Sequence, residues 1–388
     1  MSRPGEPTAG RVGRPPFANA LFFPAAAVYG AVAVPWWVLG LAGLVPVLPG
    51  LATPIGHGHE MLFGYAFAVV AGYLLGPQPL GRTLPLLGLW LVARAGFLLW
   101  PGSWFALAAV ALFAGITAAE VVPRFGRAKK WRNLTVVPVV AGFAVLAATG
   151  SAWFGTSIES EVLTAALVLL GVLMFFMGGR IIAPAIAGHV VRHGGALDAR
   201  VQPALEGVVL VALFGALVLL AVPEPRAGAA AGLLIAAAGA LTGVRAVRWR
   251  PWHCFDRPDL LILVLGYAWL AFGLLALGAA LWSGRSVQGA LHALAVGALG
   301  TLTVAVMART RLLYRFRDAN RMPAAHWAAL LMSVAALARL GYASPWAGEW
   351  GSALLAASAT CWSAALLGLL AVLAAAEWRF ARMANSGT

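Results

Sequence analysis

Two histidines and a glutamate stand at the start of a long apolar run. In the stretch PIGHGHEMLFGYAFAVVAGYLLG, residues 54–76, His57, His59 and Glu60 are the only histidine or charged residues. Imidazole is the commonest protein ligand for metals and for haem iron, and a carboxylate often fixes its second nitrogen. The pattern therefore fits a ligand set. Histidines that cap a helix among lipid head groups, with Glu60 paired to Arg94, would fit it equally well.

The composition of the chain excludes a water-soluble globule. Hydrophobic residues make up 62% of the 388 positions and charged residues only 10%, and the mean hydropathy is +0.87. Such a chain has too little polar surface to cover a globule of its size in water. The sequence therefore predicts an integral membrane protein.

Apolar runs that could cross a bilayer, at roughly 20 residues each, recur along the whole chain. They predict an all-α polytopic membrane protein with about twelve transmembrane helices. The expected spans are 19–45, 60–76, 82–100, 103–123, 134–150, 160–178, 203–222, 227–245, 258–282, 287–308, 324–343 and 350–375.

The distribution of positive charge predicts the orientation of these helices. Arg226, Arg285 and Arg339 fall in one set of connections and Arg94 within a helix, whereas the rest of the 27 Lys and Arg residues fall in the other set. Positively charged loops stay on the cytoplasmic side, so both termini are expected there. The net charge of +14 then reflects topology and anionic lipid head groups, not nucleic-acid binding.

The chain divides into three parts on this reading. Residues 1–18, rich in Pro, Gly and Arg, are expected to form a flexible cytoplasmic tail. Residues 19–378 form a single transmembrane domain, and residues 379–388 form a short cytoplasmic tail. A bacterial inner membrane is the expected location.

The histidines separate by their expected depth in the membrane. His57 and His59 are expected just before the second helix on its outer end, and His292 lies about one to two turns into the tenth helix from the same side. Arg94 and Arg339 fall at comparable depth. The remaining histidines are cytoplasmic: His189, His193, His253 and His326. We therefore expect a shallow outer cluster that unites the opening motif with His292 and Arg94.

The acidic residues argue against proton-coupled transport. All 13 of them are expected in tails, loops or end turns of helices, whereas a coupled carrier usually places an ionisable group near the midplane. Facilitated transport of a small solute or metal remains open on this pattern, because it needs no titrating carboxylate.

Four further blocks strengthen the motif around His57. The stretch GHGHEMLFGYAFAVVAGYLL is followed in order by RNL (132–134), MGGRIIAPAIAG (177–188), LGYAWLAFGL (265–274) and HALAVGALGTLTVAVMAR (292–309). With these blocks the sequence resembles the NnrS family over nearly its whole length. Members of that family are described as twelve-helix bacterial membrane proteins that contain haem and copper and are linked to nitric oxide.

The resemblance implies a ligand set. His57, His59 and His292 are the histidines inside matching blocks, so they are the leading candidates for haem or metal, with Glu60 and Arg94 as further cofactor-binding residues. His59 is preferred to His57 because it lies closer to the helix and can be held more rigidly. Which residue would hold iron and which copper stays open.

Departures from the family pattern keep the cofactor content open. The pattern has a histidine ahead of the ninth-helix aromatic block, where this chain has Val264. Three arginines in matching blocks, Arg132, Arg180 and Arg309, are expected to anchor the cytoplasmic side, or alternatively to clamp haem propionates there. The adjacent pair His253 and Cys254 is interpreted as a loop feature.

The sequence thus predicts a haem-binding membrane protein that takes part in nitric oxide handling and nitrosative-stress defence. Its expected partners are the lipid bilayer, haem, with copper as a second metal, and nitric oxide. Two other classes stay open: a small-solute or metal carrier, and a cofactor-free assembly partner of a respiratory enzyme. Whether the protein is an enzyme is left open, and no catalytic residue is assigned.

Overall fold

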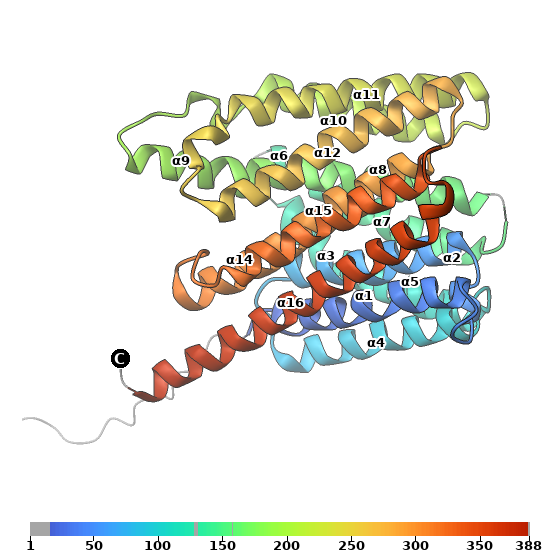
Figure 1. The fold of residues 1–388 in the computed structure, drawn as a ribbon, viewed down its shortest axis with the longest axis horizontal. Helices are drawn as coiled ribbons and strands as arrows, with labels where there is room; N and C mark the ends of the chain where they lie inside the picture. The colour runs from blue at the N-terminus through green and yellow to red at the C-terminus, as the bar shows by residue number, and fades with distance from the viewer. Residues whose placement is uncertain (1–15, 128–130, 157, 387–388) are drawn as a thin grey trace, which may run out of the picture.

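The computed structural model describes residues 16–127, 131–156 and 158–386. Most of the predicted cytoplasmic tail, residues 1–15, lies outside this part of the chain, as do Lys129 and Lys130, which belong to the set of positive charges expected on the cytoplasmic side. The described residues form a bundle of helices whose long axis is horizontal in Figure 1. The longer α-helices are α1 (Asn19–Leu41), α4 (Leu80–Leu99), α5 (Trp104–Gly126), α7 (Val136–Ala152), α8 (Ile158–Met177), α10 (Pro203–Leu220), α11 (Pro225–Arg248), α12 (Pro258–Ser283), α14 (Thr301–Phe316), α15 (Ala324–Ala343) and α16 (Gly351–Ser386).

Shorter segments complete or join these helices. The short α-helices are α2 (Pro54–His59), α3 (Phe67–Leu74), α6 (Trp131–Leu134), α9 (Ala183–Arg192) and α13 (Gln288–His292). Three π-helical segments lie inside longer helices: η2 (Glu60–Ala66), η3 (Gly178–Ile182) and η6 (Ala293–Gly300). The connections contain single 3₁₀ turns: η1 (Pro49–Leu51), η4 (Asp198–Arg200), η5 (Pro251–Cys254) and η7 (Gly348–Trp350).

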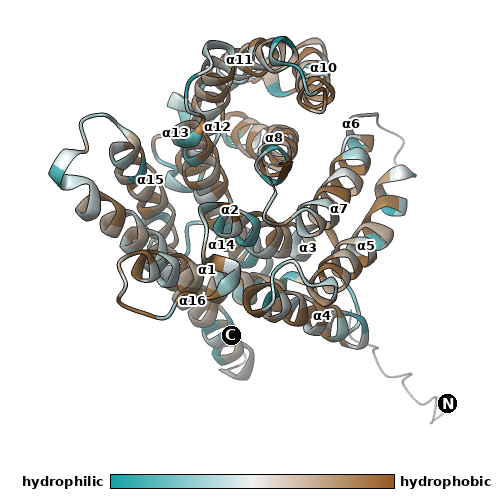
Figure 2. Cartoon of the chain, turned by 90° about the vertical axis from the view of Figure 1, so that its right-hand side faces the viewer, coloured by the Kyte–Doolittle hydropathy of each residue, from teal (hydrophilic) through white to brown (hydrophobic). Residues whose placement is uncertain are grey.

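The prediction of an all-α polytopic membrane protein is confirmed. Within the described residues, ten helices are long and apolar enough to cross a membrane. Two further apolar helices complete the predicted set of twelve: α7, which is 17 residues long, and the continuous helix from Pro54 to Leu74 formed by α2, η2 and α3. Hydrophobic residues dominate most of the helices (Figure 2), and large apolar side chains such as Val211 and Leu337 are exposed, as a lipid-facing surface requires.

One predicted boundary was wrong, and it concerns the opening motif. The sequence predicted a helix from residue 60, with His57 and His59 ahead of it, but the helix begins at Pro54. Thr53 caps this start, because its hydroxyl accepts a hydrogen bond from the Gly56 backbone N–H at 3.0 Å, and proline suits a first helical position. Both histidines therefore lie on the helix, where residues two apart point to nearly opposite faces.

Three other helices continue well beyond their predicted ends: the helix predicted to end at residue 308 runs to Phe316, and two more are longer still. α8, η3 and α9 form one helix from Ile158 to Arg192, and α16 runs to Ser386. Residues 379–386, predicted to be a tail, are therefore helical. In Figure 1, α9 and the end of α16 extend from the same side of the bundle, opposite to α2. We refer to these sides as the α9 end and the α2 end.

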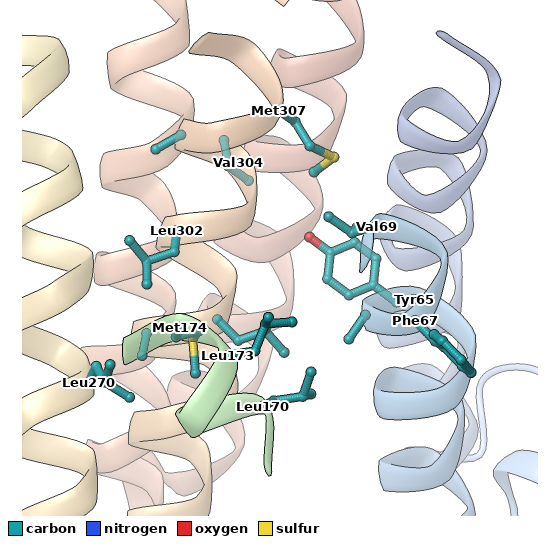
Figure 3. Close-up of a cluster of buried hydrophobic side chains, with 14 of the residues drawn as sticks. Tyr65, Phe67, Val69, Leu170, Leu173, Met174, Leu270, Leu302, Val304 and Met307 are labelled. Atoms are coloured by element: carbon teal, nitrogen blue, oxygen red, sulfur yellow. The ribbon is translucent and has the colours of Figure 1, made fainter. Parts of the chain in front are cut away.

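The core is formed where α3, α8, α12 and α14 meet. Figure 3 shows Tyr65 and Val69 facing Leu170, Leu173 and Met174 across this interior, and all five side chains are buried. Around the core, α11 packs along α12, α15 along α16, and α5 along α7. α1 also packs along α16, so the two ends of the transmembrane domain lie side by side.

Small residues on the helix of the opening motif serve helix packing. A Cβ on Gly72 would meet Phe22 at 2.8 Å, and one on Gly64 would meet the Arg94 guanidinium at 2.9 Å. Side chains from α1 and α4 therefore fill this face of the helix. The small residues at positions 64, 68 and 72, spaced four apart on one face of the helix, form a packing surface.

Candidate functional site

The residues of the predicted outer cluster lie at the α2 end, but they form two groups. His59, Glu60 and Arg94 meet in one buried group. His57 and His292 instead line a cavity. The two groups lie on different faces of the same helix, because His57 and His59 point in nearly opposite directions.

The first group, which we call the Glu60 cluster, consists of Tyr29, His59, Glu60, Arg94 and Ser151. The Glu60 carboxylate accepts hydrogen bonds from the Tyr29 hydroxyl and the Arg94 guanidinium, and it lies 3.3 Å from Nδ1 of His59. Glu60 and His59 are fully buried and Arg94 is 3% exposed. The predicted pairing of Arg94 with Glu60 is confirmed. The pairing offsets the free energy that an isolated charge within the membrane would cost.

His59 is fully engaged within this cluster. Its Nε2 lies 2.9 Å from the Ser151 hydroxyl, and its Nδ1 faces Glu60. The ring stacks on Phe97 with centroids 3.7 Å apart. With both nitrogens in hydrogen-bond contact and one face covered, the imidazole has no free lone pair directed at a cavity.

The second group lines a cavity of about 390 Å³ between α1, the opening-motif helix, α8, η6 and α16. His57 and His292 both line it, together with Arg339 from α15. Ser160, Glu161 and Gln288 give part of its wall a polar character, while Leu62, Leu291 and Trp362 are among its apolar lining residues. The cavity therefore combines an apolar interior with two imidazoles and one guanidinium.

Each histidine of the cavity has a ring nitrogen suited to a ligand. Nδ1 of His57 is buried and has no hydrogen-bond partner among the described residues, and the ring stacks on Trp37 with centroids 4.0 Å apart. Nδ1 of His292 lies 2.7 Å from the Gln288 carbonyl, which fixes the tautomer with the proton on Nδ1 and leaves Nε2 as an acceptor. The ring orientations are thus set by neighbouring groups.

Arg339 supplies an incompletely paired positive charge to the same cavity. The residue is 4% exposed, and its Nη1 is buried without a hydrogen-bond partner among the described residues. The guanidinium packs over the Tyr342 ring at 4.7 Å. A buried guanidinium with spare donors is a ready partner for a carboxylate. Sequence reasoning had placed Arg339 at the right depth but had not assigned it to the site.

The three π-helical segments coincide with three of the motif blocks. Glu60 begins η2, His292 directly precedes η6, and Arg180 lies within η3. A π-turn changes the register of a helix and leaves backbone groups to be paired elsewhere, and such turns are frequent at functional sites. At η2, the indole of Trp90 donates to the Gly64 carbonyl at 3.1 Å.

A third polar group, which sequence reasoning missed, is buried toward the α9 end. This Glu206 cluster consists of Phe175, Glu206, Arg245, Trp249 and Tyr267. Arg245 is 2% exposed and donates to the Glu206 carboxylate at 2.7 Å, to the Phe175 carbonyl at 2.8 Å and to the Tyr267 hydroxyl at 2.9 Å. In the sequence, Arg245 counts only as one of the positive charges expected in the cytoplasmic connections.

The other arginines from the motif blocks have partners of their own. Arg309 is paired with Asp259, and Arg180 donates to the Asn133 side chain at 3.1 Å. Both line a further cavity near Tyr73 and Tyr314. The side chain of Arg132 lies outside the described residues, so its two predicted roles are not distinguished.

The adjacent pair of His253 and Cys254 does not form a ligand pair. His253 is exposed, whereas Cys254 is fully buried in the turn before α12. Burial, and then the nearby Asp256 carboxylate, raise the pKa of the Cys254 thiol. The thiol therefore stays protonated at neutral pH and is a poor metal ligand. Val264, at the family's histidine position, packs against the hydrophobic core.

The fold and these groups define a polytopic α-helical membrane protein with an imidazole-lined cavity at one end of its bundle. The chain belongs to the NnrS family, since the family model described as NnrS protein matches residues 19–379. No curated protein and no solved structure matches the chain.

Proposed function

We propose that this protein binds haem in the cavity between His57 and His292 and acts in nitric oxide handling and nitrosative-stress defence in the bacterial inner membrane. One observation carries the proposal: two imidazoles from separate helices line one apolar cavity, and each has a ring nitrogen that can bind a ligand. Nδ1 of His57 has no hydrogen-bond partner among the described residues, and Nε2 of His292 is an acceptor because Nδ1 carries the proton. Membership of the NnrS family supports the choice of haem.

The cavity residues fit a haem in both its apolar and its charged parts. Trp37, Tyr65 and Trp362 offer aromatic faces to a flat macrocycle. Arg339 could pair with a propionate through its unpartnered Nη1. His57, which stacks on Trp37, and His292, fixed by the Gln288 carbonyl, are the residues that would hold the iron. A haem held there would supply an iron atom that can bind nitric oxide.

His59, Glu60 and Arg94 have a supporting role in this proposal. His59 has both nitrogens engaged, so we assign it to the Glu60 cluster and prefer His57 as the ligand. The cluster fixes the helix that carries His57, since it ties that helix to α1, α4 and α7. Copper, the second metal implied by the family, is an alternative occupant of the same histidine pair.

The test measures the haem content of the detergent-purified protein by its absorption spectrum, together with metal analysis. His57→Ala and His292→Ala should each deplete the haem or shift its bands, and the double variant should lose it. His326→Ala, a half-buried histidine on α15 that does not line the cavity, is the matched control and should keep the full spectrum. Anaerobic addition of nitric oxide should shift the bands of the unmodified protein.

Two results would contradict the proposal in different ways. Full haem content in the His57→Ala/His292→Ala double variant would move the ligand assignment away from this cavity. A protein that takes up neither haem nor copper, even when haem is supplied during expression, would leave the carrier and the assembly partner as the remaining functions. Solute flux in proteoliposomes would then separate those two.

A further inference from the structure

Two histidines and an aspartate converge beside α9, which lies at the opposite end of the bundle from α2 (Figure 1). His189 and His193 lie at the C-terminal end of α9, and Asp256 lies in the turn between η5 and α12. One ligand atom from each residue lies within 4.8 Å of the other two. Segments about 60 positions apart in the sequence thus present two imidazoles and a carboxylate to one point.

The helix sets the spacing of the two histidines. Residues four apart lie one turn apart on the same helical face, and the H-x₃-H spacing is typical of paired metal ligands. The ring centroids of His189 and His193 are 4.3 Å apart. Both rings therefore face the same side of α9, toward the turn that carries Asp256.

Hydrogen bonding prepares the more exposed ring for coordination. Nδ1 of His193 lies 2.9 Å from the His189 carbonyl oxygen, so Nδ1 carries the proton and Nε2 keeps its lone pair. Metal-bound histidines characteristically donate their second ring N–H to a carbonyl or carboxylate in this way. An ion pair between His189 and Asp256 alone would give no role to His193 or to its fixed tautomer.

We propose that His189, His193 and Asp256 bind a divalent first-row transition metal ion. Ligand atoms of a tetrahedral zinc site lie about 3.3 Å apart, given metal–ligand bonds of about 2.0–2.1 Å. Nε2 of His189 is already 3.0 Å from a carboxylate oxygen of Asp256, and the full set within 4.8 Å needs only side-chain rotation to contract.

The burial of the ligands suits an ion that enters from solvent. The side chain of His189 is 4% exposed and that of Asp256 is 59% exposed, so one ligand is held rigidly and another is accessible. With three protein ligands, a water molecule would complete a tetrahedral site. Two imidazoles favour Zn²⁺ and its neighbours over Mg²⁺ and Ca²⁺, which prefer oxygen ligands. A bound ion would clamp the end of α9 to the turn before α12.

The test is a calorimetric titration of Zn²⁺ into the full-length protein after chelator treatment in detergent. The unmodified protein should bind one Zn²⁺ ion that the His193→Ala variant either does not bind or binds at least tenfold more weakly. Asp256→Asn should have the same effect. His253→Ala, which removes an exposed histidine three positions from Asp256 but outside the cluster, should bind as the unmodified protein does. Mg²⁺ should give no such binding.

The thermal unfolding of each variant, measured with excess chelator, guards against a folding defect. His193→Ala should unfold at the same temperature as the unmodified protein under chelator, and only the unmodified protein should gain stability when Zn²⁺ replaces the chelator. Equal Zn²⁺ binding by the unmodified protein and His193→Ala would overturn the proposal. So would a loss of stability in Asp256→Asn under chelator combined with no effect of Zn²⁺ on the unmodified protein, since that pattern describes an ion pair only.

Discussion

The Glu60 cluster and the Glu206 cluster share a glutamate, an arginine and a tyrosine but differ in their other residues. Each joins a buried glutamate, an arginine and a tyrosine beside a π-helical segment. Arg245 of the Glu206 cluster also reaches a backbone carbonyl and packs over the Phe175 ring at 4.4 Å. Among the described residues, Arg94 of the Glu60 cluster has two buried nitrogens without hydrogen-bond partners, Nε and Nη2, whereas Arg245 has one, Nε.

This difference indicates what each cluster does. Arg245 on α11 makes hydrogen bonds to residues of three other helices, so the Glu206 cluster ties α8, α10, α11 and α12 together. The Glu60 cluster includes a histidine and lies on the same helix as His57, which faces the cavity. A buried ion pair stabilises a fold only when its remaining hydrogen bonds are satisfied. We therefore expect the Glu206 cluster to contribute more to stability and the Glu60 cluster to matter more for the position of the cavity.

The largest expected effect is on the Glu206 cluster. Arg245→Leu removes three buried hydrogen bonds, one of them to the Glu206 carboxylate, so it should destabilise the protein by about 3–5 kcal/mol. The double variant Glu206→Gln/Arg245→Leu should lose less than Arg245→Leu alone, because the buried group that loses Arg245 is then neutral. Unfolding in detergent measures these differences. Arg248→Leu, on the same helix but exposed, should change the free energy of unfolding by less than about 0.5 kcal/mol.

If the double variant instead lost as much as the two single variants added together, Glu206 and Arg245 would not be energetically coupled. The comparison between the two clusters would then rest on geometry alone. A milder effect of Arg245→Leu than of Arg94→Leu would reverse the proposed order of the two clusters.

The second prediction concerns the Glu60 cluster. Arg94→Leu should also destabilise the protein, by about 3 kcal/mol, because it leaves the fully buried Glu60 carboxylate with only neutral or weakly charged partners. The loss should be smaller in Glu60→Gln/Arg94→Leu. Arg82→Leu is the matched control on α4, since that side chain is exposed. Arg94→Leu should in addition lower the haem content, which Arg245→Leu should not do at equal folded fraction.

The pairing of Arg94 with Glu60 could be predicted from sequence, whereas the partners of His57 could not. The count of helices, the depth of Arg94 and the pairing followed from hydropathy and from the cost of an unpaired charge in a membrane. The start of the second helix was wrong by six residues, and this error hid the fact that His57 and His59 point in nearly opposite directions. A π-turn cannot be read from a pattern that assumes 3.6 residues per turn.

The division of the outer cluster depends on contacts between distant segments. Ser151, which binds His59, and Arg339, which lines the cavity with His57, lie on helices far away in the sequence. The position of a residue within a predicted helix gives its depth in the membrane, but it does not say which helices are neighbours. For the same reason the sequence did not reveal the role of Arg245, because a count of charges does not distinguish an arginine in a loop from one buried in an ion pair.

The smallest expected effect tests whether the two faces of the opening-motif helix are independent. Ser151 donates to the Ala147 carbonyl at 3.0 Å and contacts Nε2 of His59 at 2.9 Å. Ser151→Ala leaves that buried nitrogen without a partner, which should destabilise the protein by about 1–3 kcal/mol. Thr149→Ala, whose exposed hydroxyl binds only the backbone of its own helix, should cost less than about 0.5 kcal/mol.

Haem content is the informative measurement on Ser151→Ala. Because Ser151 and His59 face away from the cavity that His57 lines, the folded variant should keep its full haem spectrum and the band shift with nitric oxide. Loss of the spectrum in folded Ser151→Ala, with Thr149→Ala unaffected, would mean that His59 takes part in holding the cofactor. That outcome would restore His59 to the ligand set and remove the separation on which the comparison of the two clusters depends.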